Sequence, residues 1–149
     1  MKAQTARRST THRLDGAVRA WLRLARVFQK IQQAATDEFR AAGVSAGQFD
    51  MLAQIGAAEG SSQQQIADAL LVTKSNVTQL LDRMERAGLV ERQQHGRTNH
   101  LYLTVEGRRL HDQIVPAHEK HIAELLAPLT PEEIAALGQT LRKLDHALR

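Results

Sequence analysis

Residues 74–83 carry side chains whose hydrogen-bonding groups match the edges of nucleic-acid bases. Asn and Gln can bond bidentately to adenine, Arg to guanine, and Ser or Thr to several bases. The side chains of these types, with one Lys, are Lys74, Ser75, Asn76, Thr78, Gln79 and Arg83. On a helix lying in a major groove they could read base edges. A solvated helix face shows the same polar residues, so the run by itself supports both interpretations equally.

The apolar residues of the same run predict the element that positions these side chains. At about 100° per residue, one narrow stripe contains Val77, Leu80, Leu81 and Met84. Thr73 can cap a helix by accepting a backbone N–H, so we expect the helix to begin near Lys74. The face opposite the stripe then carries Ser75, Gln79, Asp82, Arg83 and Arg86.

A shorter helix and a turn precede this run. Ser62 followed by Gln65 forms a capping box, which predicts a helix beginning at Gln63. The break at Leu71 and Val72 separates the two helices. In a helix-turn-helix, the N-terminal part of the second helix contacts bases, and we expect Ser62 and Lys74 to contact phosphates.

A polar hairpin is predicted directly after the second helix. Gly88 suits the left-handed position that closes a helix. Strands are expected at 89–92 and 100–104, with a polar tip at 93–99 that contains Gly96 and Arg97. An arginine in such a tip can enter a minor groove. The fold class predicted is mainly α with a small β-hairpin, a winged helix-turn-helix.

The flanking segments predict helices that need a partner. Apolar residues recur at steps of about four and three along the first helix, as in a helix–helix seam: Leu14, Val18, Trp21, Ala25, Phe28, Ala35 and Phe39. Thr130 and Pro131 open a last helix whose stripe is Ile134, Leu137, Leu141, Leu144 and Leu148. Between them, Pro116 is expected to kink a helix over 105–126.

From Val44 to Gly107 the chain resembles the multiple antibiotic resistance regulator (MarR) family of bacterial transcription factors. The matching motifs are VSAGQFDMLAQI, QQQIADALLVTKSNVTQLLDRMERAGLVER and RTNHLYLTVEGRRL. The resemblance implies a homodimer in which helices at 13–43 and 105–149 intertwine and two DNA-binding regions, 44–104, grip a pseudo-palindromic operator. It also implies a small effector, often aromatic or phenolic, bound between the dimerisation helices and the winged region.

Two features bear on what the resemblance implies. The family usually carries an acidic residue and paired arginines in the wing, the acid steadying an arginine; here His95 stands at the acidic position and Arg97 is the arginine retained. Trp21 lies on the seam where the family's effector pocket has one wall. It could stack on an aromatic effector or serve as a core or dimer-interface residue.

Composition agrees with a single nucleic-acid-binding domain. The chain has 149 residues, 42% of them hydrophobic, a net charge of +4 and a pI near 10. Residues 1–12 are basic and are expected to form a mobile tail. Neither an apolar run of membrane-spanning length nor a signal pattern is present, so we expect a cytoplasmic protein without membrane contact.

The sequence predicts neither an enzyme nor a bound cofactor. With zero cysteines there is no thiol nucleophile and no thiolate metal site. The leading hypothesis is a dimeric regulator of transcription, a repressor that binds double-stranded DNA and is released by a small ligand. One alternative is an adaptor that has lost DNA binding, favoured by the altered wing and by Asp82. Another is a zinc-responsive regulator using His118 and His121 with His111, Glu119 or Glu124 nearby.

Overall fold

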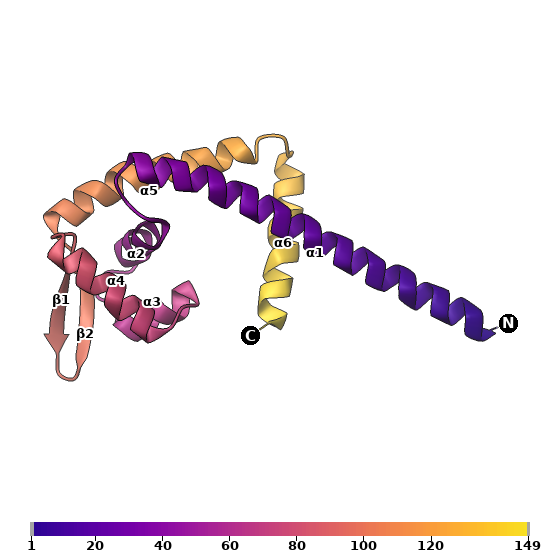
Figure 1. Cartoon of the computed structure of the whole chain (residues 1–149), viewed down its shortest axis with the longest axis horizontal. Helices are drawn as coiled ribbons and strands as arrows, with labels where there is room; N and C mark the ends of the chain where they lie inside the picture. The colour runs from indigo at the N-terminus through magenta and orange to yellow at the C-terminus, as the bar shows by residue number, and fades with distance from the viewer. Residues whose placement is uncertain (1, 149) are drawn as a thin grey trace. The chain divides into compact units, whose positions relative to one another are not determined.

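Helices make up most of the chain, and one antiparallel hairpin interrupts them (Figure 1). The computed structural model describes the backbone of residues 2–148 and the side chains of residues 15–148. The elements in order are α1 (Lys2–Ala41), α2 (Ala46–Ala57), α3 (Gln63–Leu70), α4 (Lys74–Arg86), β1 (Val90–His95), β2 (Thr98–Leu103), α5 (Val105–Leu125) and α6 (Pro131–Ala147). The mainly α fold class with a β-hairpin is confirmed. Two compact units divide the chain, one ending at Glu38 and the other beginning at Phe39.

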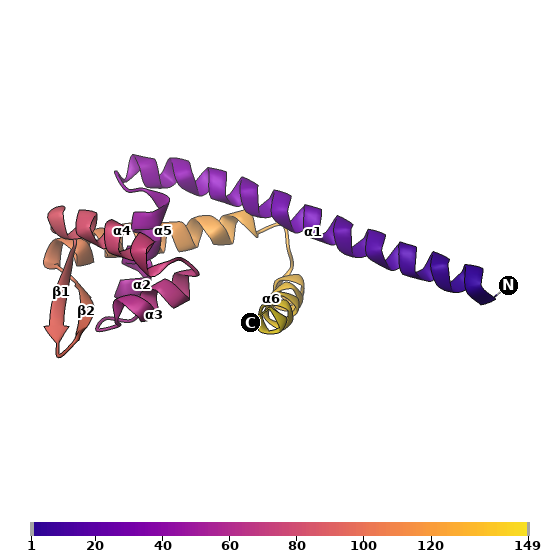
Figure 2. The same ribbon diagram turned by 60° about the horizontal axis from the view of Figure 1, so that its bottom comes forward.

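The core of the second unit lies between α2, α3, α4 and the base of the hairpin, which cluster together in Figures 1 and 2. Its largest fully buried side chains are Met51, Leu52, Ile55, Ile66, Val77, Leu81, Met84, Val90 and Leu101. Full burial of such a side chain contributes about 1.5–3 kcal/mol. Three of them belong to the predicted stripe of α4, so the stripe determines which face of that helix remains in solvent.

The helix caps agree with the sequence predictions. Ser62 Oγ accepts from the Gln65 N–H at 3.2 Å, and Gln65 Oε1 accepts from the Ser62 N–H at 2.8 Å. Thr73 Oγ1 accepts from the backbone N–H of Asn76 at 3.3 Å. These bonds satisfy donors that a helix N-terminus otherwise leaves without an intrahelical partner. They fix where α3 and α4 begin.

The turn between α3 and α4 contains a leucine where glycine is the usual residue. Leu71 has φ 54°, and its side chain is 91% exposed. Two hydrogen bonds close α3 here, from Leu71 N to Asp68 O at 3.3 Å and from Val72 N to Ala67 O at 3.1 Å. Together they form a Schellman motif, whose left-handed residue costs a non-glycine about 1–2 kcal/mol.

The hairpin is longer than the sequence predicted. Pairing runs from Val90 with Leu103 to His95 with Thr98, so the predicted polar tip, 93–99, is mostly strand. Gly96, at φ 65°, and Arg97 alone form the turn. The prediction was wrong because the outer part of the hairpin is exposed on both faces. No apolar alternation therefore marks it as strand.

A short extended segment joins the start of α3 to the hairpin. Gly60 N donates to Leu101 O at 2.8 Å, and Leu101 N donates to Ser61 O at 3.0 Å. Ser62 also forms a β-bridge with His100. This pairing holds the first turn of α3 beside β2, and no pattern in residues 60–62 predicted it.

The last two helices lie where the sequence predicted them, and the kink at Pro116 stays a prediction. α5 continues through Pro116, and α6 begins with a capping box between Thr130 and Glu133. Four apolar residues of the α6 stripe, from Ile134 to Leu144, remain between 39% and 46% exposed. Trp21 on α1 is 64% exposed. Both helices therefore carry apolar side chains that the single chain leaves in solvent.

Two sequence predictions concern the ends and the surroundings of the chain. The basic segment 1–12 falls among residues whose side chains lie outside those described, and its mobility stays a prediction; the backbone of α1 begins at Lys2. No helix within the described residues is both long and apolar enough to span a bilayer.

Gly107 lets the first turn of α5 pack directly on the loop before β1. Thr104 caps α5 by accepting from the Gly107 N–H at 3.0 Å, and its hydroxyl donates to Gly88 O at 2.5 Å. A Cβ at Gly107 would lie 1.8 Å from the carbonyl oxygen of Leu89. Because backbone cannot yield as a side chain can, this position requires glycine.

Gly107→Ala is expected to lower the free energy of unfolding by about 2 kcal/mol or more, through overpacking against backbone. Denaturant unfolding followed by circular dichroism measures the change. Gly16→Ala is the matched control: it lies within α1, its Cβ would meet nothing within 4 Å, and it should gain about 0.5–1 kcal/mol. Equal stabilities for the two variants would contradict the assigned role of Gly107.

Candidate nucleic-acid interface

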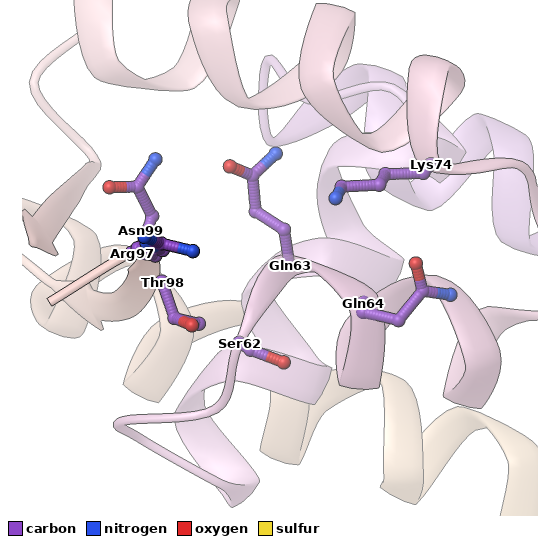
Figure 3. Close-up of a pocket in the computed structure, with 7 residues that line it drawn as sticks. All are labelled: Ser62, Gln63, Gln64, Lys74, Arg97, Thr98 and Asn99. Atoms are coloured by element: carbon purple, nitrogen blue, oxygen red, sulfur yellow. The ribbon is translucent and has the colours of Figure 1, made fainter. Parts of the chain in front are cut away.

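A polar cavity of about 310 Å³ lies where α3, α4 and the hairpin meet. Its lining comes from the first turn of α3 (Ser62, Gln63, Gln64), from the start of α4 (Lys74) and from the hairpin (Arg97, Thr98, Asn99). Figure 3 shows Gln63 projecting between Asn99 and Lys74. The structure thus brings together three residues that the sequence assigned to DNA contact: Ser62, Lys74 and Arg97.

The electrostatics of this cavity favour an anion. Lys74 and Arg97 are the two cationic side chains among its lining residues, and both are exposed. The first turn of α3 also lines the cavity, and the N-terminus of a helix carries backbone N–H groups and a positive partial charge. A phosphate group of a nucleic-acid backbone has the charge and the acceptor oxygens that such a cavity can bind.

Thr78, a predicted base reader, has its hydroxyl engaged within the protein. Its Oγ1 donates to Lys74 O at 2.9 Å and accepts from Gln63 Nε2 at 3.1 Å. The second bond links α3 to α4 and orients the Gln63 amide. The sequence did not predict Gln63, Gln64, Thr98 and Asn99 as lining residues, because their place in the cavity depends on the pairing of residues 60–62 with β2.

The other predicted readers are distributed along the exposed face of α4. Ser75, Gln79 and Arg83 are exposed, and the Ser75 hydroxyl lies 3.2 Å from the Thr73 hydroxyl. Asn76 is exposed too but lies on the opposite flank from the hairpin, lining a second cavity of about 100 Å³ with Asp50 and Val72. The middle of the face therefore belongs to Ser75 and Gln79, with Thr78 and Asn76 on either side.

The hairpin is anchored by a histidine contact that the sequence did not predict. His100 Nδ1 lies 2.5 Å from Gly60 O, and the His100 ring packs edge-on against His95, with ring centroids 5.1 Å apart. His95, the residue at the family's acidic position, thus contacts its own hairpin. The tip beyond it, with Arg97, projects into solvent.

The histidines proposed for zinc occupy other environments. The His118 ring packs against the rings of Phe39 and Phe49, at centroid distances of 4.9 and 4.7 Å. The desolvation of the nearby Asp50 raises the pKa of that carboxyl, against the opposing effect of His118. Among the residues described, no three His, Asp or Glu side chains lie close enough to hold a metal ion. The zinc alternative therefore has no support from the geometry of the single chain.

Comparison with known proteins identifies the fold and the type of site. A MarR family model matches residues 42–98. The chain is 33% identical over 131 residues to the HTH-type transcriptional regulator PecS of Dickeya dadantii, covering 84% of this chain and 79% of PecS. It resembles a mutant MarR from E. coli complexed with operator DNA (26% identity, TM-score 0.74, 81% and 89% covered). A MarR family regulator from Silicibacter pomeroyi matches with a TM-score of 0.75 at 26% identity, with 85% and 87% covered.

Helices α3 and α4 and the hairpin form a winged helix-turn-helix, and the family match and the similarity to DNA-bound MarR identify a DNA-binding regulator. The identity to PecS goes further, because it spans most of both chains. The chain belongs to the MarR family of transcriptional regulators. Its relatives are regulators of transcription and not enzymes, in agreement with the sequence prediction.

The face of α4 and the hairpin tip should make different kinds of contact. Gln79→Ala is expected to relax sequence preference at one base pair by about 1–3 kcal/mol, because an amide reads a base edge. Arg97→Ala should weaken binding to all sequences alike and reduce the slope of log affinity against log salt by about one. Fluorescence anisotropy with a panel of single-base operator variants measures both, and identical profiles for the two variants would refute the assignment.

Proposed function

We propose that this protein is a homodimeric repressor that binds a pseudo-palindromic operator and is released by a small ligand. The observation that carries the proposal is the meeting of Ser62, Lys74 and Arg97 at one cavity beside the exposed polar face of α4. The similarity to MarR in complex with operator DNA supports the DNA-binding part of the proposal.

In the proposed complex, each part of the interface has its own role. Ser75, Asn76, Thr78 and Gln79 read bases in a major groove, and Arg83 contacts bases or phosphate. Ser62 and Lys74 hold a phosphate at the cavity, and Arg97 enters the adjacent minor groove. Thr78 contacts a base through its Cγ2 methyl group, or its hydroxyl exchanges the hydrogen bond with Gln63 for one with a base.

The exposed apolar stripes of α1 and α6 support the dimer. Residues 134, 137, 141, 144 and 148 follow steps of three and four, the spacing of a helix–helix seam. Leaving such a stripe in water forfeits the hydrophobic stabilisation that a second copy would supply. Two copies can then present their recognition helices about one DNA turn, about 34 Å, apart.

Binding to DNA from upstream of the protein's own gene tests the proposal. The affinity is expected to fall by orders of magnitude between about 50 and 200 mM salt, because each phosphate contact releases counterions. Light scattering of the same sample should give the mass of two chains on one DNA. Unrelated DNA of equal length is the control. Failure to bind any of these DNAs at low salt would instead favour the adaptor without DNA binding.

Trp21, the single tryptophan of the chain, reports on the proposed effector. An aromatic ligand that stacks on the indole should quench its fluorescence and at the same time release the operator. A panel of aromatic acids and phenols tests this, with Trp21→Phe tested for operator release alone. Ligands that release DNA without changing Trp21 fluorescence would place the effector elsewhere.

A further inference from the structure

Arg92, on β1, joins the hairpin to the recognition helix α4. Its Nη1 donates to Glu85 Oε2 at 2.6 Å, and its Nη2 donates to Asp82 Oδ1 at 2.7 Å and to the carbonyl oxygen of Thr78 at 3.3 Å. The backbone N–H of Arg92 donates to Glu85 Oε1 at 3.1 Å. Arg92 therefore bonds to three residues of α4, Thr78, Asp82 and Glu85, that follow one another along one side of the helix.

The Arg92 side chain is well shielded from water. It is 18% exposed, and its Nε is buried without a hydrogen-bond partner among the described residues. Charge-assisted hydrogen bonds in such a setting are stronger and less screened by salt than exposed ion pairs. Two carboxylates and a carbonyl on different turns also restrict how α4 can rotate against β1.

The same contacts change the charge that α4 presents to DNA. Asp82 lies on the polar face of α4, one turn beyond Gln79, and its carboxylate is half exposed. A free carboxylate there would repel the phosphates of a bound duplex. The Arg92 guanidinium, which comes from the hairpin, carries the opposite charge and forms ion pairs with both Asp82 and Glu85.

We infer that Arg92 is a positioning residue for DNA binding. It sets the hairpin, and with it Arg97, at a fixed angle to α4, and it offsets the negative charge of Asp82 and Glu85. This role rests on the proposed DNA-binding function. Asp82, whose position on the polar face favoured the adaptor without DNA binding, is then a partner of the residue that orients the hairpin.

The inference predicts that the loss of Arg92 lowers affinity through the DNA contact of Arg97. Arg92→Gln should weaken operator binding at least about tenfold, and it should lower the slope of log affinity against log salt by no more than Arg97→Ala does, because the contact that is lost belongs to Arg97. Arg97→Ala, the matched control, should lower that slope by about one. Arg92→Lys, which keeps the charge but carries its N–H donors on a single nitrogen in place of a planar fork, should bind operator DNA with an affinity between those of Arg92→Gln and the native chain.

A double-variant cycle distinguishes positioning from a general loss of structure. If Arg92 acts through the wing, Arg92→Gln should cost clearly less when Arg97 is already Ala than in the native chain. A variant that merely destabilises the fold would show no such coupling. Should Arg92→Gln not fold, Glu85→Ala removes one partner of Arg92 from the helix side and should also reduce affinity several-fold, with no further change of the salt slope when Arg97 is already Ala.

The outcomes separate the inference from the function on which it rests. If the native chain does not bind operator DNA, the proposed function fails. If the native chain binds and both Arg92→Gln and Glu85→Ala bind equally well, the positioning role is wrong. A salt slope in the double variant that is lower by about one than in Arg97→Ala alone would also overturn it, because Arg92 would then contact phosphate directly.

Discussion

Burial of the α4 stripe is the constraint on which the rest of the interface depends. Val77, Leu81 and Met84 are fully buried, and a helix held by one face has a single orientation left for the other. Ser75 and Gln79 are therefore presented to solvent by the packing behind them. Apolar side chains stabilise the fold, whereas the polar side chains that could select a DNA sequence contribute little to that stability.

Two backbone connections convert this helix into an interface. The pairing of residues 60–62 with β2 brings the first turn of α3 beside the hairpin, and the close approach of Gly107 to Leu89 holds α5 against the loop before β1. Each is a contact between segments distant in sequence. The cavity lined by Ser62, Lys74 and Arg97 exists because both connections fix the hairpin relative to the helices.

The local parts of this arrangement could be predicted from sequence, and the non-local parts could not. The caps at Ser62 and Thr73, the α4 stripe and the stop at Gly88 each depend on residues within one or two turns, and all were predicted. The outer hairpin was not, because Gln93, Gln94 and Asn99 face solvent on both sides and leave no alternation to detect. The roles of Gln63 and Arg92 also escaped prediction, since their partners lie on other elements.

The contacts that support the hairpin differ from those usual in the wing of the family. His95 cannot hold an arginine as a carboxylate would, yet its ring packs on His100, and His100 contacts Gly60. Arg92 adds the charged connection at the base of the hairpin, where shielding from water strengthens it. Support at the base fixes the direction of the hairpin and leaves the Arg97 side chain free to adapt. An arginine that adapts suits a minor groove whose width varies with sequence, whereas the packed α4 suits the major groove, where base edges require fixed geometry.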